Sequence, residues 1–347
     1  YKKNVSKYIL VLVLINIAFS PIHGYYSVTM WKDVLFSGLF LLFILYIIKV
    51  DEHFSFKLFD MIGFIILSLL FLFFRNNALY VYVFTIPFLI YLYRDKLMKI
   101  LLCFLVSLGC YFVVKGPVFS HFNIRKSSSS EYIAIPLQQI GRMAYKYVDF
   151  TDDEISLIDD LMPVDVMSSV YNPMTVDSIK FNKLYHKDMF DSNKSKYFKL
   201  WFQLVLKHPS IAVESYLSST LGYWYSNVEF WATADSIYTN DMDIYSSPKG
   251  GKLINAYVKN SVSRNIPIIS LQWSIGLCFI FIWFSVLLLF VQKKFRSLFY
   301  YVPLLGVWLT LMIATPVFAE FRYIYCAFTS LPLFLILPFL NIKKESK

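Results

Sequence analysis

The sequence predicts an all-α polytopic membrane protein with about eight transmembrane helices and a helical extracytoplasmic insert. The composition is the first observation: of 347 residues, 57% are hydrophobic, 19% aromatic and only 16% charged. The mean hydropathy of +0.55 is that of a membrane protein, because a soluble chain of this length could not bury so much apolar surface. The second observation is a set of apolar runs on both sides of one long polar stretch. The third is the placement of Lys and Arg in short clusters at the ends of those runs.

Each apolar run is a candidate membrane span. Several are short for a hydrocarbon core of about 30 Å, which requires about 20 helical residues. Flanking Tyr and Trp side chains are expected to extend these runs into the interface. The eight runs are 8–20, 33–50, 58–74, 78–93, 97–115, 268–291, 298–316 and 323–340.

The basic clusters predict the orientation of the chain. If eight runs alternate across the membrane, all five clusters fall on one side, which is then the cytoplasm. Both termini of this chain are therefore expected to be cytoplasmic in a multi-pass protein of the bacterial plasma membrane. The clusters are Lys2, Lys3 and Lys7; Lys49 and Lys57; Arg94, Lys96 and Lys99; Lys293, Lys294 and Arg296; and Lys343, Lys344 and Lys347.

The same alternation divides the chain into three parts. Residues 1–117 hold spans one to five, 118–267 form a mostly helical extracytoplasmic segment, and 268–347 hold the last three spans and a cytoplasmic tail. The net charge of +10 does not indicate nucleic acid binding, since the basic residues flank apolar runs. All four cysteines lie inside apolar runs, so the outer segment has no disulfide framework.

Residues 131–148 are expected to form a helix in the outer segment. The apolar residues at 133, 137, 140, 144 and 148 follow helical spacing, and the polar residues at 138, 139 and 142 fall off this stripe. Thr151 and Glu154 form a capping box that starts another short helix. Residues 194–208 and 211–224 are amphipathic and aromatic. They lie either on the membrane surface or against each other and the bundle, and the sequence does not decide between these arrangements.

Titratable residues in the first outer loop are the first candidates for a site. His23, Lys32 and Asp33 lie at the mouth of a span beside aromatic residues. Asp33 at the start of an apolar run is costly unless it caps the helix, pairs with Lys32 or has a function. The non-functional interpretation is an N-terminal cap with an interfacial aromatic belt.

Arg75, Asn76 and Asn77 follow an apolar run without a spacer. A guanidinium and two amides on the outer side suit an anionic ligand, because arginine binds phosphate through a planar fork. Asn residues also favour a turn between spans, so a purely structural role is the alternative. A turn does not require the arginine.

Two further groups of polar residues are expected on the outer side. Gln138, Gln139 and Arg142 suit sugar hydroxyls and phosphate, or alternatively form a solvated helix face. Glu320 and Arg322 lie just before the last run, and since residues two apart do not face each other on a helix, each is expected to have its own partner. We expect Asp33, Arg75, Gln139, Arg142 and Arg322 to line one cavity, because the three arginines lack obvious counter-charges.

Six segments of the chain resemble bacterial domain-of-unknown-function family 6020, membrane proteins that look like C-type glycosyltransferases. The resemblance covers nearly the whole chain. These segments are WKDVLFS (31–37), FRNNALY (74–80), IPLQQIGRMA (135–144), YNPMTVDSIK (171–180), KLWFQLVLKHPSIAVESYLSSTLGYW (199–224) and EFRYIY (320–325).

The resemblance implies a C-type glycosyltransferase-like fold and activity. Such an enzyme moves a sugar from a polyprenyl-phosphate carrier to a glycan or lipid acceptor at the outer membrane face. It implies a catalytic carboxylate in the first outer loop, for which Asp33 is the candidate in this chain. Members of the family carry additional N-terminal spans, so Tyr1 is expected to fall within a longer parent chain. The general base then lies either at Asp33 or in that region.

Three classes of function follow from these observations. The first is a glycosyltransferase whose partners are a polyprenyl-phosphate sugar donor, a glycan or lipid acceptor and membrane lipid. The second is a polysaccharide polymerase or ligase, which would produce a ladder of glycan lengths. The third is a non-enzymatic lipid or glycan transporter or scaffold, which the scarcity of charges within the runs disfavours. No zinc motif or Gly-rich phosphate loop is present, and a divalent cation is the one cofactor left open.

Overall fold

The computed structural model describes residues 6–52, 56–124, 133–226, 228, 239–245, 251–314 and 317–340. The first two residues of the expected 131–148 helix and the basic residues at 2, 3, 343, 344 and 347 lie outside these ranges. The regular secondary structure of the described residues is helical, apart from one isolated antiparallel bridge between Thr175 and Val317. This confirms the all-α class.

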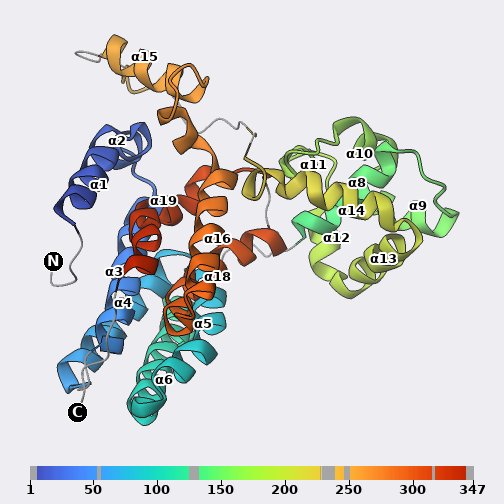
Figure 1. Cartoon of the computed structure of the whole chain (residues 1–347). Helices are drawn as coiled ribbons and strands as arrows, with labels where there is room; N and C mark the ends of the chain where they lie inside the picture. The colour runs from blue at the N-terminus through green and yellow to red at the C-terminus, as the bar shows by residue number, and fades with distance from the viewer. Residues whose placement is uncertain are drawn as a thin grey trace. The chain divides into compact units, whose positions relative to one another are not determined.

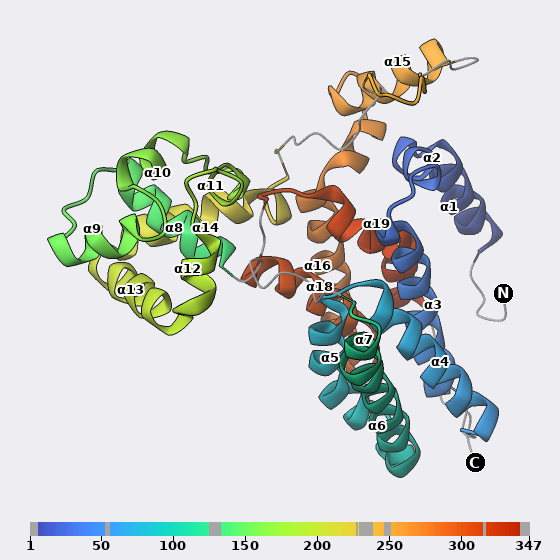
Figure 2. The same ribbon diagram turned by 180° about the vertical axis from the view of Figure 1, so that it is seen from behind.

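The chain divides into two compact units (Figures 1 and 2). The first unit contains residues 1–124, 224–308 and 320–347, and the second contains 125–223 and 309–319. The described residues of 224–267, which we expected in the outer segment, thus belong by their contacts to the same unit as the apolar helices.

The first unit is a helical bundle. In it, α3 packs against α4 and α19, α4 against α6, and α16 against α19 (Figures 1 and 2). Its α-helices are α1 (Lys7–Phe19), α2 (Pro21–Ser27), α3 (Lys32–Glu52), α4 (Leu58–Phe74), α5 (Ala78–Leu92), α6 (Leu97–Val113), α7 (Phe119–His121), α15 (Gly251–Val262), α16 (Ile275–Val291), α17 (Phe295–Leu298), α18 (Val302–Ile313, which continues into the second unit) and α19 (Phe321–Ile336). Shorter turns are η1 (Arg94–Lys96), η2 (Val114–Val118), η5 (Ile269–Trp273), η6 (Phe299–Tyr301) and η7 (Leu337–Phe339).

Each of the eight apolar runs coincides with a helix, but their lengths differ. Four helical stretches are long and apolar enough to cross a membrane: Lys32–Glu52, Arg94–His121, Phe295–Ile313 and Phe321–Phe339. A fifth candidate is α1 with α2, which are bent by 58° relative to each other. The helices α4, α5 and α16 have 17, 15 and 17 residues, fewer than the about 20 needed to cross unaided. The multi-pass character is therefore supported, and the count of eight spans stays a prediction.

Aromatic side chains fill the interior of the bundle. Phe43 stacks on Phe71 at 5.1 Å between ring centroids, and Phe64 meets Phe104 edge-on at 5.7 Å. Tyr82 lies between these pairs and is buried. Rings at such offset and edge-on distances attract one another beyond the effect of their buried area, which favours one fixed packing of α3, α4, α5 and α6.

The second unit is built around α8 (Ala134–Tyr145), which contacts α10, α13 and α14. Leu200 and Leu204 of α13 and Ala212 of α14 share a buried core with Ile140 and Met143 of α8. The two amphipathic helices therefore pack on each other and on α8. The remaining helices are α9 (Asp152–Asp159), α10 (Val164–Val170), α11 (Asp177–Lys180), α12 (Lys187–Ser192), α13 (Lys194–Lys207), α14 (Pro209–Thr220) and η4 (Leu221–Tyr223).

Candidate functional site

A buried ion pair lies at the end of the bundle where α3 begins. Asp33 is in the first turn of α3, and its Oδ1 is 3.7 Å from Nε of Arg75. Both side chains are only 8% exposed. Arg75 follows the last residue of α4 in an extended conformation, so its side chain leaves the helix and donates from Nη1 to the main-chain oxygen of Tyr323. Asp33 thus pairs with Arg75 rather than with Lys32, which is exposed.

A second ion pair stands beside the first. Glu320 precedes α19 and its Oε1 is 3.4 Å from Nε of Arg322. The expectation that these residues have separate partners is wrong, because Glu320 has an extended backbone rather than a helical one. The guanidiniums of Arg75 and Arg322 both lie against the ring of Tyr323, at 5.3 and 4.9 Å from its centroid. The guanidinium of Arg322 also lies 5.4 Å from the ring centroid of Trp31.

Aromatic rings cover these charges. Tyr26 of α2 stacks on Tyr325 of α19 at 4.5 Å and meets Trp31 edge-on at 5.7 Å. His23 Nδ1 is 3.0 Å from the Tyr325 hydroxyl. The Tyr26 hydroxyl is buried and has no hydrogen-bond partner among the described residues, although Glu320 is close enough to act on it electrostatically. We call Asp33, Arg75, Glu320 and Arg322, with His23, Tyr26, Trp31, Tyr323 and Tyr325, the Asp33 cluster.

The two asparagines after Arg75 lie in the turn between α4 and α5. Asn76 is exposed, and Asn77 occupies the position before α5 without a side-chain capping bond. Their placement matches the structural alternative of a turn between two helices.

The other three predicted site residues belong to the second unit, where each bonds to that unit's own groups. Gln139 donates to the main-chain oxygen of Ala212 at 2.9 Å and accepts from the indole nitrogen of Trp201 at 2.6 Å. Gln138 donates to the main-chain oxygen of Asn172 at 2.9 Å. Both amides are buried, so the alternative of a solvated helix face is excluded for them, because α10, α13 and α14 pack against α8.

Arg142 has a counter-charge that the sequence did not reveal. It forms an ion pair with Glu214 of α14 and a 3.3 Å hydrogen bond to the hydroxyl of Tyr171. The hydrogen bond from Arg142 lowers the pKa of Glu214 below its ordinary value. Arg75, Arg142 and Arg322 are thus each paired with a carboxylate. The expectation that these three arginines lack counter-charges is therefore wrong. Of the five residues expected in one cavity, Asp33, Arg75 and Arg322 come together, whereas Gln139 and Arg142 lie in the second unit.

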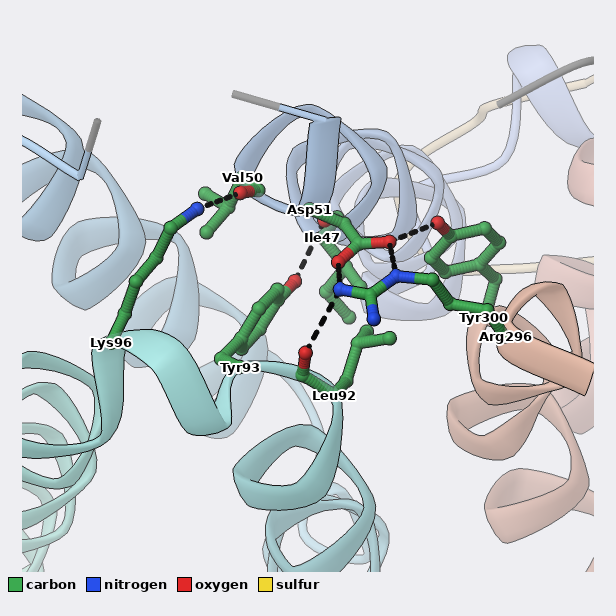
Figure 3. Close-up of polar contacts among 8 residues, drawn as sticks. All are labelled: Ile47, Val50, Asp51, Leu92, Tyr93, Lys96, Arg296 and Tyr300. Carbon is green, nitrogen blue, oxygen red and sulfur yellow. Dashed lines mark hydrogen bonds and ion pairs between the residues drawn. The ribbon is translucent and has the colours of Figure 1, made fainter. Parts of the chain in front are cut away.

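A different polar cluster lies at the other end of the bundle, where α3 ends (Figure 3). Asp51, near the end of α3, is 2% exposed and accepts from Arg296 at Nε, 2.8 Å, and from the Tyr300 hydroxyl at 2.6 Å. Arg296 also donates from Nη2 to Asp51 and, at 3.0 Å, to the main-chain oxygen of Leu92 at the end of α5. We call Asp51, Arg296 and Tyr300 the Asp51 cluster. With a rise of about 1.5 Å per residue, the 18 steps along α3 from Asp33 to Asp51 span about 27 Å.

Basic residues at this end also complete the ends of neighbouring helices. Lys96 donates to the main-chain oxygen of Val50 at 2.6 Å (Figure 3), and Lys99 donates to that of Phe56 at 2.7 Å. Lys294 donates to the oxygen of Pro338 at 2.5 Å. Three of the predicted cytoplasmic clusters, those around residues 49–57, 94–99 and 293–296, therefore meet at one end of the bundle, opposite the Asp33 cluster. Which side of the membrane this end faces stays a prediction.

A cavity of about 150 Å³ lies in the first unit, and its described lining includes no residue of the Asp33 cluster. Within the described ranges, no group of three or more His, Cys, Asp or Glu side chains is arranged to hold a metal ion. The cavity is lined by Ser226, Val228, Val262, Arg264, Pro267, Ile268, Ser270, Leu271, Trp273 and Ser274.

Comparison with known proteins places the chain in a family without identifying its activity. No curated protein and no solved structure matches it. A family model described as "Family of unknown function (DUF6020)" matches residues 1–347, the whole chain. The chain therefore belongs to the family of unknown function DUF6020.

Proposed function

We propose that this protein is a glycosyltransferase that moves a sugar from a polyprenyl-phosphate carrier to a cell-surface glycan or lipid acceptor. In this proposal it has eight spans and a C-type glycosyltransferase-like fold, and the Asp33 cluster faces the outside. The observation that carries the proposal is a buried carboxylate paired with the guanidinium of Arg75, with a second guanidinium, that of Arg322, against the same tyrosine ring, at one end of an apolar bundle. The family resemblance described above supports the same reaction class.

The chemistry of the Asp33 cluster fits such a transfer. A carboxylate is needed to take the proton from the acceptor hydroxyl as it attacks the anomeric carbon, and Asp33 is the candidate. Arg75 and Arg322 are placed to neutralise the charge that develops on the departing lipid phosphate. In the structure described here, Arg75 holds Asp33 in a 3.7 Å pair. Binding of the lipid phosphate to Arg75 would loosen that pair and release Asp33 to act as the base.

The rings around the charges suit the sugar. Trp31, Tyr323 and Tyr325 offer flat apolar faces next to the two arginines. The buried Tyr26 hydroxyl offers a polar atom that a sugar hydroxyl would satisfy once α2 moves aside. We therefore place the sugar between the Tyr26–Tyr325 stack and the Asp33 carboxylate.

The proposal is tested by analysing lipid-linked and surface glycans in cells that carry the intact gene, a deletion, or one of two variants. Asp33→Asn keeps the shape of the side chain and removes its basicity, and Arg75→Gln removes the phosphate partner. We expect both variants and the deletion to accumulate the same lipid-linked sugar and to lose the same product. Asp60→Asn, which changes a half-buried carboxylate at the other end of the bundle, is the matched control and should leave the glycans unchanged.

Three outcomes separate the possibilities. If deletion changes no lipid-linked glycan, the glycosyltransferase proposal is wrong. If deletion removes the product but both variants make it normally at wild-type protein levels, the reaction class survives and the Asp33 cluster is not its site. If loss of the product removes a ladder of glycan lengths rather than one species, the protein is a polymerase.

A further inference from the structure

The segment 251–274, which comprises α15, the loop after it and η5, has an unusual mixture of residues. It contains three cations, Lys252, Lys259 and Arg264, and no Asp or Glu. It also exposes large aliphatic side chains, with Leu253 80% and Ile268 77% accessible. Basic residues beside exposed apolar side chains are typical of segments that lie on an anionic membrane surface.

The position of this segment in the chain places it at the end of membrane-spanning helices. Ser274 is the cap of α16, accepting a hydrogen bond from the main-chain nitrogen of Leu277 at 3.1 Å, and α16 is apolar throughout. Tyr257 of α15 donates to the main-chain oxygen of Phe19, the last residue of α1, at 2.7 Å. The segment is therefore attached to the ends of two apolar helices, which is where lipid headgroups would lie.

Most of the described residues that line the cavity belong to this segment. The indole nitrogen of Trp273 in η5 donates to the hydroxyl of Ser261 in α15 at 2.8 Å and so holds the two walls together. Arg264 lines the cavity with Ser270 and Ser274, while Ile268 and Leu271 supply apolar lining. Among the described lining residues, Arg264 is the one cation and it lies with hydroxyls and aliphatic side chains, a combination that matches a phosphate carrying an apolar tail.

The strained backbone at Ile268 supports a functional role for this side of the cavity. Ile268 has φ 70° and ψ −54°, and the main-chain nitrogen of Ile269 donates to the oxygen of Pro267 at 2.8 Å, which makes a three-residue γ-turn. A β-branched residue is strained at positive φ, and here the strain also turns an aliphatic side chain outward. Contact with water does not stabilise the exposed Ile268 side chain, whereas a lipid acyl chain would cover it.

We propose that the cavity of segment 251–274 binds the phosphate of an anionic membrane phospholipid, with Arg264 as the phosphate ligand and Ile268 and Leu271 against its acyl chains. This site is distinct from the Asp33 cluster and does not depend on the activity proposed for it. Trp273 connects the two regions, because its ring lies 5.7 Å from that of Phe321, between Glu320 and Arg322 in sequence. A lipid bound here would hold η5 against the start of α19.

The test measures lipid retention by the full chain in detergent, using native mass spectrometry. The chain is incubated with phosphatidylglycerol, phosphatidylcholine or inorganic phosphate. We expect one phosphatidylglycerol to be retained in preference to phosphatidylcholine. Arg264→Gln should weaken this retention about tenfold, the effect of losing one charge-assisted hydrogen bond. Lys259→Gln removes the same charge from the same segment outside the cavity lining, and should change retention by less than about twofold.

A second variant separates lipid binding from folding. Ile268→Gly fits the positive φ without strain and removes the aliphatic side chain, so it should raise the unfolding temperature and lower phosphatidylglycerol retention. The proposal is overturned if Arg264→Gln and Lys259→Gln weaken retention equally, which would indicate diffuse surface charge alone. Equal retention of both lipids, full displacement by inorganic phosphate, or absence of any retained lipid would overturn it as well.

Discussion

Replacing Asp51 by Asn should destabilise the first unit far more than the loss of a surface charge would. The Asp51 carboxylate is 2% exposed and accepts hydrogen bonds from Arg296 and Tyr300, and Arg296 continues to the end of α5 at Leu92 (Figure 3). These contacts join α3 to two helical segments that are distant in sequence. Asn keeps the size of the side chain but removes the charge and one acceptor oxygen.

The expected cost follows from the burial of each partner. Breaking a buried ion pair from one side costs about 3–5 kcal/mol, because the remaining charge stays desolvated. The Arg296 side chain is 44% exposed, so water compensates part of that loss. The Tyr300 hydroxyl loses a charged acceptor, which costs about 1 kcal/mol. We therefore expect Asp51→Asn to lower the free energy of unfolding by about 2–3 kcal/mol, or the unfolding temperature by about 5–10 °C.

The chain contains its own reporters for this measurement. Cys103, Cys278 and Cys326 are buried and Cys110 is exposed. In a Cys110→Ser background, a thiol-reactive dye in detergent should report unfolding only when the buried thiols become accessible. The parent and Asp51→Asn are compared in the same detergent at the same protein concentration.

A matched surface pair and a double mutant decide the interpretation. Lys49 and Asp60 are 3.5 Å apart with side chains 51% and 26% exposed, so Lys49→Gln should cost less than about 1 kcal/mol. Arg296→Met combined with Asp51→Asn should cost less than the two single changes together, because neither charge is then left alone. The reasoning fails if Asp51→Asn is no more harmful than Lys49→Gln, or if the two single changes simply add.

Two further predictions concern close packing and pH. A Cβ at Gly276 would lie 2.3 Å from the main-chain oxygen of Tyr225, so Gly276→Ala should cost about 1–3 kcal/mol in the same dye assay, whereas Gly109→Ala, which meets nothing within 4 Å, should be tolerated. Glu214→Gln should destabilise the second unit at pH 7, and its difference from the parent in tryptophan-monitored thermal unfolding should vanish as pH falls below 4.5. The hydrogen bond from Arg142 lowers the pKa of Glu214 from its ordinary value of 4.5. The ion pair therefore stabilises the fold fully above pH 4.5, and this stabilisation is lost as the pH falls below 4.5 through the lowered pKa. A difference in stability that does not depend on pH would contradict this.

The helices could be predicted from sequence where the signal is local. Apolar runs of the right length became helices, and the Thr151–Glu154 capping box is present with both reciprocal bonds. The break at His208 and Pro209 falls where expected, with α13 ending at Lys207 and α14 beginning at Pro209. Each of these signals depends on residues within a few positions of one another, so one sequence is sufficient to read them.

Contacts between distant residues could not be predicted in the same way. The sequence indicated either a ligand site or a solvated helix face for Gln138 and Gln139, yet both are buried within the second unit, because polarity along one helix does not reveal which other helices will cover it. Glu214, the partner of Arg142, comes from a helix 72 residues further along the chain. Within the Asp33 cluster, the sequence identified the charged residues but not that Arg75 would take Asp33 as its partner.

The lysines and arginines at the Asp51 end of the bundle have two roles. The predicted orientation of the chain depends on their charge, while Lys96 and Lys294 also donate hydrogen bonds to main-chain oxygens near helix ends. Moving such charges to other loops is a common way to invert the orientation of a membrane protein. Here it would also remove the hydrogen bonds that these lysines donate at helix ends. If a variant with relocated charges did not invert, defective helix assembly would explain the result as well as a failure of the positive-inside rule. Insertion mapping of this family is better done with neutral glycosylation or cysteine tags that leave these cations in place.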